Sequence, residues 1–153
     1  MKRLITVLSC LICIQLFACC NKNNEVTSGP NNVLNTDSMK LKITIGTNTF
    51  TAVLYNNTTA AAFKEKLPLT INMSELNRNE KYFDLPNNLP SNASNPGTIQ
   101  AGDLMLYGSN TLVLFYKTFS TSYNYSRIGR IDNTSGLSAA LGSGNTTVKF
   151  ELE

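Results

Sequence analysis

Residues 102–116 read GDLMLYGSNTLVLFY and decide the fold of this chain. Two short apolar runs are separated by Gly108, Ser109 and Asn110, which is typical of a tight turn between strands. The second run, residues 112–116, is apolar at every position, as in a strand buried on both faces. The stretch therefore predicts a β-hairpin whose second strand lies in the interior of a mainly β protein.

Six further segments of the chain have strand character. Some alternate polar and apolar residues, because side chains of a strand point in turn to its two faces. The segments are residues 40–45, 50–55, 69–73, 81–85, 127–131 and 147–152. Together with the two strands of the hairpin, they predict eight strands.

Two short helices interrupt the strands. Residues 60–67 follow three N-capping side chains and place Phe63 and Leu67 on one face, which predicts a short amphipathic helix. Residues 135–141 predict a second helix that ends at Gly142, because glycine is favoured just after a helix.

A loop rich in proline separates the strands at 81–85 and 102–107. Residues 86–97 hold three of the five prolines of the chain, which predicts a surface loop. We predict one mainly β domain at residues 39–153, folded as a closed eight-stranded barrel with two short helices. Closing the barrel removes exposed sheet edges.

The N-terminus has the pattern of an export signal. Lys2 and Arg3 precede a largely apolar stretch at residues 4–18, which predicts a signal peptide at residues 1–18. The apolar stretch is shorter than the roughly 20 residues that a membrane-spanning helix needs.

A lipid-anchoring motif follows the apolar stretch. Residues 16–19, LFAC, resemble a bacterial lipobox, which implies cleavage after Ala18 and lipid attachment at Cys19. Lipidation at Cys20 and an ordinary secretory signal are the alternatives. We expect Cys19 to hold the protein on a membrane.

Residues 19–38 predict a lipidated cysteine followed by a flexible linker. The segment is rich in Asn, Thr, Ser and Gly and has few apolar residues to bury. We expect the protein in the bacterial cell envelope, lipid-anchored to the outer membrane or at the cell surface, with its domain outside the cytoplasm. The sequence leaves the membrane leaflet, the ligand and the oligomeric state open.

Composition excludes several classes of function. The chain has no histidine, and its four cysteines all lie in the first twenty residues. A Ser-His-Asp triad and a site with His or Cys metal ligands are therefore excluded from residues 39–153, and we expect no metal and no cofactor. Without Lys2 and Arg3 the formal net charge falls from +3 to +1, and no basic stripe indicates a nucleic-acid partner.

A series of short motifs carries a family resemblance. The motifs, in chain order, are LPLTINM at 67–73, EKY at 80–82, PGTI at 96–99, GDL at 102–104 and GRID at 129–132. In combination with the apolar run at 112–116, they resemble the bacterial cyclophilin-like fold family. The resemblance implies an eight-stranded barrel with a helix near each end, and it does not imply isomerase activity.

The residues argue against prolyl isomerase activity. Cyclophilin isomerases carry a Phe-His-Arg strand whose guanidinium stabilises the twisted prolyl bond, and here residues 91–93 read SNA at the matching spacing. Residues 100–103, QAGD, resemble the second isomerase motif, which makes Gln100 a candidate contact to a ligand. Arg127 or Arg130 would have to replace the missing arginine. We therefore predict a non-catalytic module that binds a small or peptide-like ligand, with an isomerase of exported proteins as the alternative.

Aromatic residues supply the other candidate ligand contacts. Tyr123 and Tyr125 stand two positions apart, so in an extended chain both side chains project to one side. A purely structural role for this aromatic run is the alternative interpretation. The candidate ligand-binding residues, expected near the barrel opening, are Gln100, Tyr107, Tyr123, Tyr125, Arg127 and Arg130, and no catalytic residue is assigned.

Four carboxylates in the domain are candidates for an acid–base pair. They are Glu75, Glu80, Asp84 and Asp103. No motif holds two of them together as a hydrolase requires, so we interpret them as hairpin-end and surface carboxylates.

Overall fold

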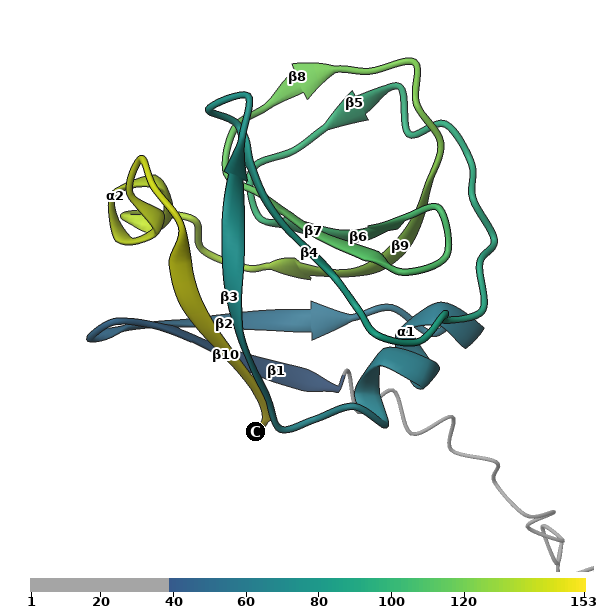
Figure 1. Cartoon of the computed structure of the whole chain (residues 1–153), viewed down its shortest axis with the longest axis horizontal. Coiled ribbons are helices and arrows are strands. Elements are labelled where there is room, and N and C mark those ends of the chain that lie inside the picture. Colours follow the sequence, from purple (N-terminus) through teal and green to yellow (C-terminus); the bar gives the residue numbers. More distant parts are fainter. Residues whose placement is uncertain (1–38) are drawn as a thin grey trace, which may run out of the picture. The chain divides into compact units, whose positions relative to one another are not determined.

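The computed structural model describes residues 39–153. The predicted signal peptide at 1–18, Cys19 and the linker at 19–38 lie outside the described residues. The described part is mainly β, with a closed eight-stranded antiparallel barrel and two short helices, which confirms the predicted fold class (Figure 1). No helix within it is long and apolar enough to cross a membrane.

The barrel strands follow one another in the order β1-β10-β3-β4-β7-β6-β9-β2. The elements, in chain order, are β1 (Lys40–Ile45), β2 (Asn48–Leu54), α1 (Thr58–Lys64), β3 (Leu69–Leu76), β4 (Glu80–Asp84), β5 (Thr98–Ile99), β6 (Asp103–Tyr107), β7 (Thr111–Phe115), β8 (Phe119–Ser120), β9 (Tyr125–Ile131), α2 (Leu137–Leu141) and β10 (Thr146–Leu152).

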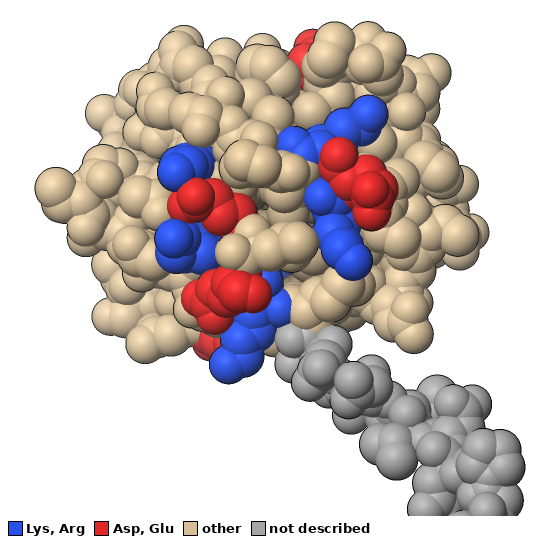
Figure 2. All heavy atoms as spheres, turned by 90° about the horizontal axis from the view of Figure 1, so that it is seen from below, with Lys and Arg blue, Asp and Glu red and all other residues tan. Residues whose placement is uncertain are grey.

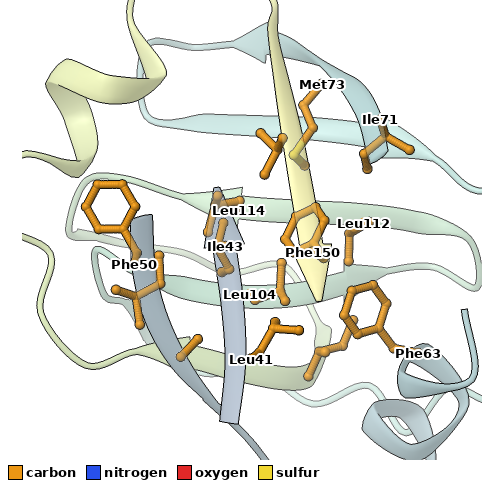
Figure 3. Packing of buried hydrophobic residues seen from close by; sticks show 14 of the residues in the cluster. Leu41, Ile43, Phe50, Phe63, Ile71, Met73, Leu104, Leu112, Leu114 and Phe150 are labelled. Carbon is orange, nitrogen blue, oxygen red and sulfur yellow. The ribbon is translucent and has the colours of Figure 1, made fainter. Parts of the chain in front are cut away.

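Alternating residues fill the barrel with apolar side chains. In β1, Leu41, Ile43 and Ile45 are buried, while Lys42 and Thr44 between them are not. Ile43 pairs with Phe150 of β10, and the side chains of β3, β6 and β7 meet them in the interior (Figure 3). The barrel interior is thus a packed apolar core.

Strand β7 is buried on both faces, as its continuous apolar run predicts. Leu112 and Leu114 belong to the core inside the barrel. Val113 and Phe115 belong to a second apolar cluster on the outer wall. That cluster is covered by a two-stranded sheet, in which β5 pairs with β8. Figure 1 shows this small sheet above β6, β7 and β9.

The small β5–β8 sheet is absent from the predicted element order. Each of its strands has two residues, so neither shows a periodic pattern that a sequence reading can detect. Tertiary packing stabilises the sheet, because Ile99 of β5 and Phe119 of β8 pack in the outer cluster.

Helix α1 covers one end of the barrel. The Asn57 side chain accepts a hydrogen bond from the Ala60 amide (2.8 Å), which starts the helix at the predicted N-capping residues. Phe63 contacts Phe150 edge to face, with ring centroids 5.8 Å apart (Figure 3). The helix ends at Lys64, three residues before the predicted end at Leu67.

A buried ion pair fixes the other end of the barrel, near α2. The Lys81 side chain points into the barrel with no exposed surface, and its ammonium donates to the carbonyl oxygens of Gly142 (2.9 Å) and Gly144 (2.6 Å). Its third partner is the carboxylate of Glu75, which also accepts a hydrogen bond from the Tyr116 hydroxyl (2.8 Å). Every ammonium hydrogen of Lys81 therefore has a partner.

The same cluster shifts two pKa values. Burial acts to raise the pKa of Glu75, but the hydrogen bonds from Lys81 and Tyr116 and the lysine charge hold it below its usual value. Burial, together with the hydrogen bond to Glu75, raises the pKa of Tyr116 to about 12. Glu75 therefore stays ionised and Tyr116 stays protonated near neutral pH.

Charged side chains are mixed in sign on the face shown in Figure 2, where Lys and Arg alternate with Asp and Glu. Among the described residues, the ammonium groups of Lys42 and Lys149 lie 3.2 and 2.8 Å from the carboxylate of Glu151. Pairs of this exposed kind contribute little to stability.

Candidate functional site

A pocket of about 580 Å³ opens on the outer wall of the barrel, which we call the outer-wall pocket. Strands β4 and β7 form its floor, and the turn before β4, the end of β6 and the segment from β8 to β9 form its sides. The pocket is lined by Leu76, Asn77, Asn79, Glu80, Tyr82, Asp84, Tyr107, Thr111, Val113, Phe119, Ser120, Thr121, Ser122, Tyr123 and Tyr125. Its volume is in the range typical of small-molecule sites. The pocket lies on the wall of the barrel, whereas the ligand-binding residues were expected near the barrel opening.

Aromatic rings make up much of the pocket. Tyr107 stands between two others, with its ring centroid 6.1 Å from that of Tyr123 and 5.6 Å from that of Tyr125. Tyr107 and Tyr123 are 45% and 60% exposed, so much of their ring surface is free for a ligand. Tyr82 and Phe119 add two further rings.

Strand β4 supplies the acidic side of the pocket. Alternation along the strand turns Glu80, Tyr82 and Asp84 to the outer wall, while Lys81 points inward. The Glu80 side chain is nearly buried, and within residues 39–153 its carboxylate has no hydrogen bond or ion pair. Burial, followed by the nearby charge of Glu75, raises the pKa of Glu80 to about 7. Asp84 accepts a hydrogen bond from the Thr111 hydroxyl (2.6 Å).

The turn between β3 and β4 borders the same pocket. Asn77 and Arg78 have positive φ values of 55° and 58°, as the two central residues of a type I′ turn do. The next residue, Asn79, has a buried side-chain oxygen that lacks a hydrogen-bond partner in the described part of the chain. A buried acceptor of this kind is costly unless a donor reaches it.

The structure brings three of the six predicted ligand-binding residues together. Tyr107, Tyr123 and Tyr125 all line the outer-wall pocket. Tyr125 is also 7% exposed and packs its ring against Phe115, 5.5 Å between centroids, so it belongs to the outer core cluster as well. Burial, then the charge of Glu80, raises the pKa of Tyr125 to about 12.

The other three predicted residues lie elsewhere. Gln100 is half-buried, and its backbone amide donates to Asp103 (2.8 Å). The Nε of Arg130 lies 3.8 Å from the other carboxylate oxygen of Asp103. Arg127 lines a second pocket of about 170 Å³ together with Asn57. Neither arginine lines the outer-wall pocket.

The interpretation of the four carboxylates as hairpin-end and surface groups is wrong for two of them. Asp103 is 1% exposed and Glu80 is 9% exposed. The Asp103 carboxylate stabilises the turn at residues 100–103, because it accepts a hydrogen bond from the backbone amide of Gln100. Glu80, Tyr82 and Asp84 were missed as pocket residues, although their alternate positions in a strand segment place them on one face.

The chemistry of the pocket favours binding. Aromatic rings with polar tips and a few placed polar groups are typical of ligand sites. Within residues 39–153 there is no group of three or more His, Cys, Asp or Glu side chains that could hold a metal ion.

Comparison with known proteins identifies the family of this fold. A model of the cyclophilin-like family matches residues 43–151. The solution structure of a hypothetical protein from Archaeoglobus fulgidus is similar, with a TM-score of 0.52 and 21% sequence identity over 76% of this chain and 95% of that chain. Identity at that level shows a shared fold alone. No curated protein matches the chain. Because the family match spans more than half of the sequence, the chain belongs to the cyclophilin-like family.

Proposed function

We propose that this protein is a non-catalytic binding module of the bacterial cell envelope, which holds a small or peptide-like ligand in the outer-wall pocket. The observation that carries the proposal is the pocket itself, about 580 Å³ in volume and lined by Tyr82, Tyr107, Tyr123 and Tyr125. Large, rigid tyrosine rings offer contact area to a ligand at a low cost in side-chain entropy.

The arrangement of the arginines supports binding without prolyl isomerisation. Stabilising a twisted prolyl bond requires a positioned cation, and such groups typically contribute several kcal/mol to catalysis. Arg127 lines the smaller pocket, and Arg130 lies beside the buried carboxylate of Asp103. A ligand in the outer-wall pocket therefore meets neither of the two arginines that were candidates to replace the missing one.

Saturation-transfer NMR with a library of N-acetyl amino-acid amides tests the binding role. We expect transfer from the purified protein to some of these amides, and we expect it to fall strongly in Tyr107→Ala and Tyr123→Ala. Both tyrosines are exposed, so the melting temperature should barely change. Tyr55→Ala is the matched control, because Tyr55 lines neither pocket. Equal transfer in all four proteins would move the site away from the outer-wall pocket.

Exchange spectroscopy on the peptide acetyl-Ala-Ala-Pro-Phe-amide tests the catalytic alternative. At micromolar protein we expect the cis–trans exchange rate to equal the uncatalysed rate. A strong acceleration that is lost in Arg127→Ala or Arg130→Ala would establish the isomerase alternative in its place.

We also propose that lipid on Cys19 tethers the domain to a membrane, as the lipobox indicates. Metabolic labelling with a fatty-acid analogue should label the parent protein, and Cys19→Ala should lose the label. Cys20→Ala is the control and should keep it. Label that survives in Cys19→Ala and disappears in Cys20→Ala would move the site by one residue, and an unlabelled parent would indicate an ordinary secretory signal.

A further inference from the structure

The charge of the outer-wall pocket points to one class of ligand. Glu80 and Asp84 line it together with several aromatic rings, and no Lys or Arg is among its lining residues in the described part of the chain. We propose that the pocket binds the protonated amino group of its ligand, such as a lysine side chain of a peptide or a free alkylamine. This inference rests on the proposed function and names the chemistry of its ligand.

Aromatic rings favour a cation at this place. The face of a tyrosine ring attracts an ammonium group, and the attraction grows when water is excluded. Tyr107 and Tyr123 are accessible at the pocket, while Tyr125 is largely buried beneath them. An ammonium group here would contact ring surface and keep its alkyl stem on the apolar side chain of Val113 or Phe119.

One carboxylate in the pocket lacks a partner. The Glu80 side chain is largely buried, and its carboxylate has no hydrogen bond or ion pair within residues 39–153. Its oxygens are not among the fully buried unpartnered atoms, so they are accessible from the pocket. A protonated amine in the pocket would supply a positive charge beside this carboxylate.

The basic side chains of the neighbouring elements do not line the outer-wall pocket. Lys81 lies inside the barrel, where Glu75 and two carbonyl groups hold it. Arg130 lies beside Asp103, and Arg127 lines the second pocket. Arg78, in the turn before β4, is exposed and is not among the residues that line the pocket. The charged side chains in the lining are therefore Glu80 and Asp84.

Two matched probes test the charge of the ligand. Nα-acetyl-lysine methylamide and Nα-acetyl-norleucine methylamide share their butyl chain, and only the first carries an ammonium group. Four of the six tyrosines line the pocket and the chain has no tryptophan, so tyrosine fluorescence responds to a ligand bound there. At pH 8 we expect the lysine probe to bind about tenfold more tightly or better. Butylamine, as a third probe, distinguishes a free amine from a peptide side chain as the source of the group.

The outcomes separate the two proposals. A norleucine probe that binds in the pocket as tightly as the lysine probe overturns the charge inference and leaves the proposed function standing. If neither probe nor any amide of the library binds, both proposals fall.

Glu80→Gln gives a second test. Between pH 6 and pH 8 Glu80 loses its proton, so the affinity for the lysine probe should rise in the parent and stay flat in Glu80→Gln. The other groups that act on Glu80 do not titrate in this range, since Glu75 is ionised, Tyr116 and Tyr125 are protonated, and the chain has no histidine. Glu65→Gln, an exposed site at the end of α1, should behave as the parent does. A rise in Glu80→Gln equal to that in the parent would contradict the inference.

Discussion

Replacing Lys81 by alanine should lower the free energy of unfolding by about 3–5 kcal/mol, the cost of breaking a buried ion pair by removing one partner. The substitution leaves the Glu75 carboxylate with Tyr116 as its remaining side-chain donor. It also leaves the carbonyl oxygens of Gly142 and Gly144 without their donor and opens a cavity at a fully buried site. Urea unfolding of the two proteins measures the difference.

Two further variants show that the loss comes from the ion pair. Lys149→Ala removes an exposed lysine that pairs with Glu151 and should change the free energy by less than about 1 kcal/mol. Lys81→Met keeps most of the volume, and adding Glu75→Gln to it should recover part of the loss, because the uncompensated charge is then gone. A loss in Lys81→Ala no larger than that in Lys149→Ala would contradict the account of this cluster.

Glu80→Gln should stabilise the protein at pH 8 and change its stability little at pH 5. The pKa of Glu80 is about 7 in the folded protein and 4.5 in its ordinary state. Between these values the folded state binds more protons than the unfolded state, so the free energy of unfolding falls as the pH rises. At about 1.4 kcal/mol per pKa unit, the gain of the glutamine variant at pH 8 is up to about 3 kcal/mol.

Urea unfolding at pH 5 and pH 8 measures this prediction, with Glu65→Gln as the control at an exposed position. The pKa of Glu75 is shifted in the opposite direction, so its contribution is lost only as the pH falls below the ordinary range of a carboxyl group. If the free energy of unfolding of Glu80→Gln had the same pH dependence as that of the parent, ionisation of Glu80 would not destabilise the folded protein, which would contradict this prediction.

The barrel could be predicted because its strands carry simple patterns. Residues 40–45 alternate, and Leu41, Ile43 and Ile45 are indeed buried. The run at 112–116 lacks alternation because the outer wall carries a second apolar cluster on the far side of β7. The continuous apolar run thus reflects packing on both faces of β7, inside the barrel and on its outer wall.

The pocket was harder to predict, because its residues come from distant parts of the chain. Tyr123 and Tyr125 stood out as aromatic residues in a polar segment, and they line the pocket with Tyr107. Glu80 was interpreted as a surface carboxylate because its burial depends on β7 and on the turn before β4, which no local pattern reveals. Gln100, singled out by a motif, lies instead in the turn that Asp103 holds.

The most direct test of the account is to map where the lysine probe binds. We expect that titrating ¹⁵N-labelled protein with Nα-acetyl-lysine methylamide at pH 8 shifts the amide signals of Tyr82, Tyr107 and Tyr123 on the outer wall most strongly. Shifts confined to Asn57 and Arg127 at the smaller pocket, or to Gln100 and Arg130, would contradict the claim that the outer-wall pocket is the binding site.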